Sequence, residues 1–234
     1  MPFGLTLLDL LAVAVFAVCY IGFSWAVDRG PLSRRLGLMR AVDARREQWM
    51  FEASEREIRI IDAQLLTTLS SGSAFFASTS LIVLGGLSAM LGAADQVKQR
   101  LTDLPFSANT DLALLELKIL FLIALVIRAF FKFAWAFRLT HYLSIMIGSM
   151  PTTFGPDETD EQRETRLRHA SKASRLSSLA ALHTNGGMRT IYFAIAGLGW
   201  FINPLVFLIS CVWVTSVVYR REFRSRALDA ISDG

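Results

Sequence analysis

Basic residues inside apolar sequence are the side chains of this chain that could do chemistry within a membrane. Arg128 and Lys132 stand four residues apart in the apolar stretch 112–137, and Arg138 continues roughly the same helical side. Arg189 stands at the start of a later apolar stretch. Because a charge at membrane depth is costly unless it is paired or hydrated, we interpret these four residues as candidate contacts for an anion or a lipid headgroup. The alternative is that these long side chains only extend to nearby phosphates without forming a site.

A second set of candidates combines carboxylates with basic groups. This candidate polar cluster consists of Glu55, Glu57, Arg59, Asp62 and His183. Glu55 and Asp62 lie two helical turns apart, a spacing that would suit acid–base or metal chemistry if another segment completed the site. Glu55 and Arg59 are also at the spacing of an ordinary salt bridge on a solvated helix.

Motifs that normally carry catalysis are absent from the sequence. It lacks GxGxxG, a Walker loop and a GxSxG nucleophile, and its three histidines do not have the spacing of metal ligands. We therefore predict no catalytic residue, no metal and no cofactor, and we favour a non-enzymatic protein.

The composition indicates a membrane protein. Of 234 residues, 53% are hydrophobic and 19% are charged, with a mean hydropathy of +0.43, values that exclude an ordinary soluble domain. The formal charge of +4 comes without a separate basic domain, so nucleic acid is not expected as a partner.

The length that a helix needs to span a bilayer predicts four hydrophobic segments in a single membrane domain, 1–234. The segments run over residues 5–27, 73–92, 112–137 and 190–219. Basic residues number eight in the segment 28–71, two between the second and third stretches, and six in the segment 140–189. Because basic residues favour the cytoplasm, we expect these two long segments to be cytoplasmic and the N-terminus to lie outside.

The C-terminal tail disagrees with a count of four spans, because it is basic and four spans would put it outside. Asn203 and Pro204 interrupt the last apolar stretch. The stretch is either one kinked span or a pair of half-helices that returns the tail to the cytoplasm. Each half is short for a full crossing, so the kinked span is the preferred interpretation.

Local signals predict helices in both cytoplasmic segments. Ser54 and Glu57 have the spacing of a capping box at a helix start. Asn185-Gly186-Gly187 is typical of a helix end and predicts that a cytoplasmic helix stops there.

Small residues recur at helical spacing along the second apolar segment. The predicted packing residues are Ala74, Ser78, Gly85, Ser88 and Gly92. Small residues on one side let helices approach closely in lipid, so we expect this side to contact another helix, within the chain or in a second copy.

Several strings in the sequence resemble a known family. They include Phe75-Phe76-Ala77-Ser78-Thr79-Ser80, Phe130-Phe131-Lys132-Phe133-Ala134-Trp135, Asn185-Gly186-Gly187-Met188-Arg189 and Tyr219-Arg220-Arg221-Glu222-Phe223. The strings are similar to those of the DUF599 family across most of the chain. The resemblance implies a multi-pass membrane protein, found in bacteria and plants, to which no activity is assigned.

These observations predict an all-α, multi-pass helical membrane protein with cytoplasmic amphipathic helices. We expect a self-associating scaffold, transport or permeation component in the bacterial cytoplasmic membrane, with the bilayer and its anionic lipids as partners. The alternative is a membrane-interface enzyme that acts on a lipid-like substrate.

Overall fold

The fold of this chain is built from helices alone in the part that the structure describes. That structure, a computed structural model, describes residues 5–35, 37–102, 111–151, 155 and 158–232. The elements are α1 (Leu7–Ala17), the π-helical turn η2 (Val18–Gly22), α2 (Phe23–Asp28), the 3-10 turn η3 (Pro31–Arg34), α3 (Leu38–Glu55), α4 (Ile60–Gly92), α5 (Ala94–Thr102), α6 (Leu112–Gly148), α7 (Asp160–Ile202), α8 (Pro204–Phe223) and α9 (Arg226–Ser232). The predicted all-α class is confirmed.

Three helices among the described residues are long and apolar enough to cross a membrane. They run over Leu7–Asp28, Ile60–Gly92 and Pro204–Ser232. The first of them joins α1, η2 and α2 without a break, and its start is capped by Thr6 and Asp9, which bond to each other's backbone. These helices support a membrane location for the protein.

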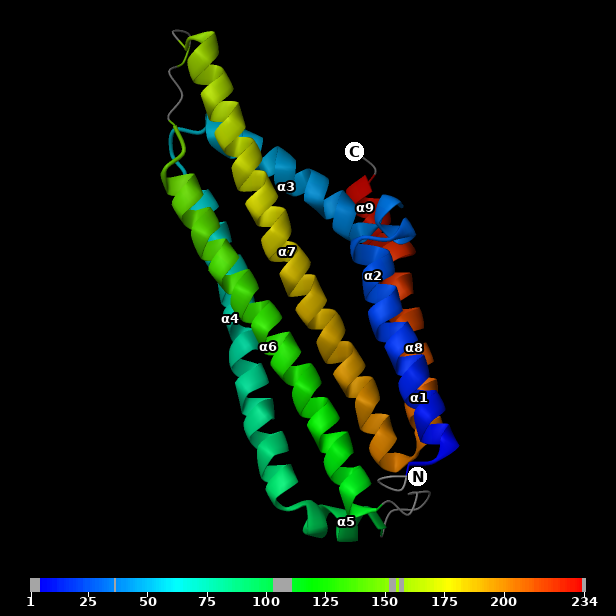
Figure 1. Ribbon diagram of the computed structural model, residues 1–234. Helices are drawn as coiled ribbons and strands as arrows, with labels where there is room; N and C mark the ends of the chain where they lie inside the picture. Colours follow the sequence, from blue (N-terminus) through cyan, green and yellow to red (C-terminus); the bar gives the residue numbers. More distant parts are fainter. Residues whose placement is uncertain (1–4, 36, 103–110, 152–154, 156–157, 233–234) are drawn as a thin grey trace.

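Helix α6 lies between α4 and α7 (Figure 1). On the other side of α7, α8 lies beside α1 (Figure 1). Aromatic rings from four helices fill the core there: Phe16, Phe121, Phe193, Trp200 and Phe207. Helix α3 crosses the opposite end of the bundle, where it packs on α7 and on α9 (Figure 1).

The chain reverses direction at the predicted break. Asn203 is extended, with φ −163° and ψ 163°, and its side chain accepts a hydrogen bond from Val206 N at 2.8 Å, while Pro204 begins α8. Helices α7 and α8 then run antiparallel as a hairpin; Figure 1 shows α7 in yellow to orange and α8 in orange to red. The preferred interpretation of one kinked span is therefore wrong, and the C-terminal tail lies at the same end as α3.

Two helix-boundary predictions are also wrong. Asn185-Gly186-Gly187 does not end a helix, because α7 continues through it from Asp160 to Ile202. There a Cβ on Gly187 would lie 2.7 Å from ring carbons of Phe133, so close packing on α6 explains this glycine. Ser54 does not start a helix either, because α3 ends at Glu55 and the Ser54 hydroxyl donates to Phe51 O at 2.6 Å.

The small-residue side of α4 makes no close contact with the described part of the subunit. Ser78, Gly85, Ser88 and Gly92 are exposed, and Ala74 is half-buried. A Cβ added at Gly85 or at Gly92 would meet no neighbouring atom within 4 Å. The inward side of α4 carries Ser73 and Ser80 instead, so the predicted packing side is left for lipid or a second copy.

Candidate anion-binding site

A basic cavity opens where the first helix, α6 and α7 meet. Its volume is about 320 Å³, which lies within the range of small-molecule sites. The lining residues are Tyr20, Ile21, Ser24, Trp25, Asp28, Arg29, Arg128, Lys132, Leu182 and His183. Two of the four predicted anion contacts, Arg128 and Lys132, are thus brought to one cavity.

A relay of hydrogen bonds holds Arg128 at this cavity. Arg128 Nε donates to the Tyr20 hydroxyl at 2.8 Å, which lies 2.8 Å from Thr190 Oγ1. The Thr190 hydroxyl in turn donates to Gly186 O at 2.8 Å, so it accepts from Tyr20. Tyr20 belongs to the π-helical turn η2, a feature that is frequent at functional sites. The relay holds Nε of the Arg128 guanidinium. Its two terminal nitrogens have no hydrogen-bond partner among the described residues.

Lys132 lies one helical turn from Arg128 and is half-buried against α7. A Cβ on Gly186 would collide with Lys132 Nζ, so the absence of a side chain at that position makes room for the ammonium group. No hydrogen bond or ion pair joins Lys132 Nζ to another described residue. Lys132 therefore lines the cavity without forming an ion pair within the described residues.

The one carboxylate that lines the cavity is already engaged. Asp28 Oδ1 accepts from Arg189 NH2 at 2.5 Å, and Arg189 is 6% exposed. Arg189 Nε is buried without a partner among the described residues. Arg189, the third of the predicted contacts, therefore does not line the cavity but pairs with its acidic residue, while Arg29, Arg128 and Lys132 line it without an ion pair to a described residue.

His183 contributes a neutral group to the same cavity. Burial lowers the pKa of His183, and the charge of Lys132 lowers that pKa further, whereas Asp28 acts in the opposite direction. At neutral pH the imidazole therefore offers hydrogen bonding instead of a charge. The candidate polar cluster grouped His183 with Glu55 and Asp62, and the structure does not bring them together.

Arg138, the fourth predicted contact, lies outside the cavity. It is exposed on α6 and its Nε donates to the hydroxyl of Tyr142 at 2.7 Å. Local pairing one turn along the same helix accounts for this side chain.

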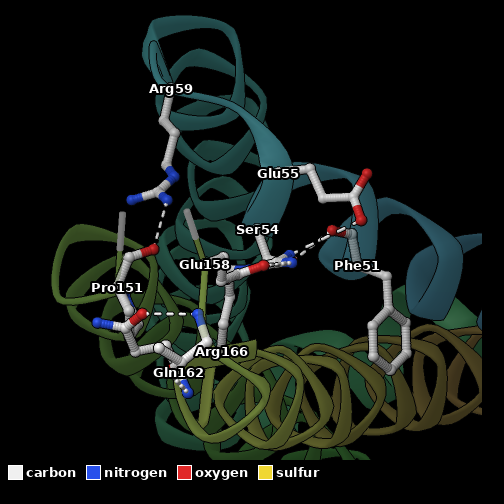
Figure 2. Close-up of polar contacts among 9 residues, drawn as sticks. Phe51, Ser54, Glu55, Arg59, Pro151, Glu158, Gln162 and Arg166 are labelled. Atoms are coloured by element: carbon white, nitrogen blue, oxygen red, sulfur yellow. Dashed lines mark hydrogen bonds and ion pairs between the residues drawn. The ribbon is translucent and has the colours of Figure 1, made fainter. Parts of the chain in front are cut away.

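The remaining cluster residues lie at the far tip of the bundle, where two arginines bind the helix ends together (Figure 2). Arg166 binds both carboxylate oxygens of Glu158 at 2.8 and 3.0 Å and donates to Ser54 Oγ at 3.0 Å, with Glu55 at 3.7 Å. Arg59 donates to the carbonyl oxygens of Ala53, Met150 and Pro151. Every guanidinium nitrogen is used, so these arginines are structural.

Charge pairing at the tip stabilises the ionised forms of both partners. The hydrogen bond from Arg166 lowers the pKa of the Glu158 carboxyl below its usual value, and Glu158 raises the pKa of Arg166. Asp62, fully buried, accepts from Trp49 Nε1 and from Arg56 NH1 at 2.7 Å each. Glu57 makes no hydrogen bond or ion pair with another described residue, and no catalytic arrangement of these carboxylates is formed in the part of the chain described.

Sequence reasoning missed the residues that support the cavity, and it missed the burial of Asp9. Tyr20, Asp28 and Thr190 were not among the candidates, although a tyrosine inside an apolar span was a usable signal. At the opposite end Asp9 is buried, and it accepts from Trp200 Nε1 at 2.7 Å. Its oxygens also accept from Thr6, so it is fully satisfied by the protein.

Within the described residues, no three His, Cys, Asp or Glu side chains gather as metal ligands would. Comparison with known proteins finds no match among curated proteins or among solved structures. A family model described as "Protein of unknown function, DUF599" matches residues 11–227, which is nearly the whole chain. The chain therefore belongs to the DUF599 family.

Proposed function

We propose that this protein is a non-enzymatic membrane component, of the scaffold, transport or permeation kind, that binds an anionic ligand in the basic cavity. The observation that carries the proposal is the uneven charge of that cavity. Arg29, Arg128 and Lys132 line it, and its one carboxylate is paired with Arg189. Cations that lack a protein partner near a membrane are stabilised by an anion.

The contrast with the tip supports this proposal. Arg59 and Arg166 use all their nitrogens within the protein, whereas Arg128 uses Nε alone among the described residues. Free donors at a cavity are available to a ligand, and satisfied donors are not.

The distance between the candidate catalytic residues weakens the alternative, a membrane-interface enzyme. Such an enzyme would need Glu55 and Asp62 to act together with His183, which the candidate polar cluster grouped with them. Arg166, which contacts Glu55, and His183 are seventeen residues apart on α7, which places them about 25 Å apart along the helix.

A co-purification experiment tests the proposal. The protein is extracted in mild detergent, and its bound anions are identified by mass spectrometry for the wild type, Lys132→Gln and Arg138→Gln. We expect an anion that is retained by the wild type and by Arg138→Gln, the matched control on the same helix, and depleted in Lys132→Gln. Equal anion content in all three proteins would refute the proposed site.

We further propose self-association through α4 and an orientation with the N-terminus outside the bacterial cytoplasmic membrane. The exposed small-residue side of α4 supports the first proposal, because such sides pack helices closely in lipid. The hairpin of α7 and α8 supports the second, because it returns the basic tail to the end where the basic α3 lies. The tail and the other basic segments then share one side of the membrane.

A further inference from the structure

We infer that the occupant of the basic cavity is an anionic membrane lipid that enters sideways from the bilayer. Its phosphate lies between Arg128 and Lys132, and its acyl chain leaves over Ile21 and Trp25. The inference rests on the proposed anion site and names the chemical class of its ligand.

The polar half of the cavity suits a phosphate group. The two terminal nitrogens of Arg128 make no hydrogen bond to a described residue, and neither does the ammonium group of Lys132. The hydrogen-bond relay through Tyr20 ties Arg128 Nε, so the terminal nitrogens are held in one orientation. A guanidinium held this way can donate to two oxygens of one phosphate, with the ammonium on a third.

The other half of the cavity is apolar and faces outward. Ile21 and Trp25 line the cavity and are 64% and 60% exposed on a helix that is long and apolar enough to cross a membrane. Leu182 lines it from α7. A soluble anion would make no contact with these side chains, whereas the chain of a lipid would pack on them.

Charge in the cavity selects an anionic lipid over a zwitterionic one. Arg29 adds a third cation at the rim, and Asp28 is held by Arg189. A choline headgroup would bring its own cation into this basic surrounding, where like charges repel. A headgroup with a phosphate and no cation avoids that repulsion.

The depth of Arg128 separates a site from simple snorkelling. Arg128 lies one helical turn further into the apolar stretch than Lys132, and its Nε is bonded to Tyr20, so it is not extended freely toward the surface. Its terminal nitrogens are therefore held where a phosphate that enters the cavity can reach them.

The test uses the full-length protein, stripped of lipid in detergent and followed by thermal unfolding. Short-chain phosphatidic acid, short-chain phosphatidylcholine and inorganic phosphate are titrated separately. We expect phosphatidic acid to raise the unfolding midpoint in a saturable manner, with little effect from the other two at equal concentration. Lys132→Gln should need at least about tenfold more phosphatidic acid for the same rise, because a charge-assisted contact is lost. Arg138→Gln should respond as the wild type does.

A second pair of variants tests whether the exposed apolar residues of the cavity contact the lipid chain. Ile21→Ser should weaken the response to phosphatidic acid, whereas Ile209→Ser, which alters a similarly exposed isoleucine on α8, should not. Neither residue is buried, so both variants are expected to fold.

The outcomes distinguish a wrong ligand class from a wrong binding site. If inorganic phosphate stabilises the protein as well as phosphatidic acid does, the lipid inference is overturned while the anion site stands. If phosphatidylcholine is equally effective, headgroup charge is not recognised and the inference also fails. If no compound acts, or Lys132→Gln responds as the wild type does, both the lipid inference and the anion site fail.

Discussion

Gly186 and Gly187 are neighbours in α7, yet we expect alanine to have opposite consequences at the two positions. A Cβ at position 187 would lie 2.7 Å from Cε1 and Cζ of Phe133, a side chain that is 0% exposed and has no room to move. A Cβ at position 186 would meet the end of Lys132, which can swing into the cavity. Gly187→Ala should therefore destabilise the fold, and Gly186→Ala should displace only the lysine.

The pair of variants isolates the steric effect. Replacing glycine by alanine within a helix favours folding by about 1 kcal/mol, and this contribution is common to both positions. Overpacking of a filled core costs about 1–3 kcal/mol. Gly187→Ala should thus be less stable than Gly186→Ala by about 2 kcal/mol, which corresponds to roughly 4–8 °C in the unfolding midpoint for a chain of this size.

Thermal unfolding in mild detergent, followed by tryptophan fluorescence, measures this difference. Gly85→Ala serves as a control, because nothing lies within 4 Å of the added carbon. Equal midpoints for the two variants at 186 and 187, or a lower midpoint for Gly186→Ala, would show that the contact between α6 and α7 is not as described.

Three other predictions follow from the geometry. Because Arg166 lowers the pKa of Glu158, the pair stabilises the tip above the ordinary carboxyl pKa of 4.5 and loses that effect as the pH falls through the lower folded-state pKa. Glu158→Gln should therefore show reduced hydrogen-exchange protection of α3 already at about pH 6, where the exposed control Glu164→Gln should match the wild type. Gly85→Leu should convert the protein to a smaller species on size exclusion with unchanged helicity if α4 joins subunits, and an unchanged size would remove the support for self-association. Cysteines at Ser171 and Ser232 should both be shielded from an impermeant thiol reagent in intact cells, while a cysteine at Gln99 should react; the reverse pattern would contradict the orientation.

The sequence was sufficient for the class of fold because bilayer thickness imposes a length on apolar segments. It was also sufficient for the break at Asn203 and Pro204. It could not distinguish a kink from a hairpin, because a proline that bends a helix and one that begins the next helix look alike along the chain. The outcome depends on whether the two halves pack on each other. Here Gly199 allows that packing, since a Cβ there would lie 3.2 Å from the backbone of Phe207.

Only those residues of the site that are close together in the sequence could be predicted. Arg128 and Lys132 share a helix, so their spacing of four residues already placed them together. Asp28 and Arg189 are separated by 161 residues, and no local pattern links them. Gly186 and Gly187 led to a wrong helix boundary for a related reason: propensity favours a helix end there, whereas close packing on Phe133 calls for glycine at position 187 within the helix.

The hairpin of α7 and α8 also constrains how the chain is inserted during translation. The part of α7 between Gly186 and Ile202 is shorter than the roughly 20 residues of a typical spanning helix, and it carries Arg189, so it is a poor stop for the translocon alone. The single residue Asn203 joins it to α8, so the nascent chain delivers both helices as one unit. Arg189 then meets Asp28 on the first helix to be synthesised. This ion pair therefore joins the first helix to be synthesised to one of the last, and it can form only after α7 has been synthesised.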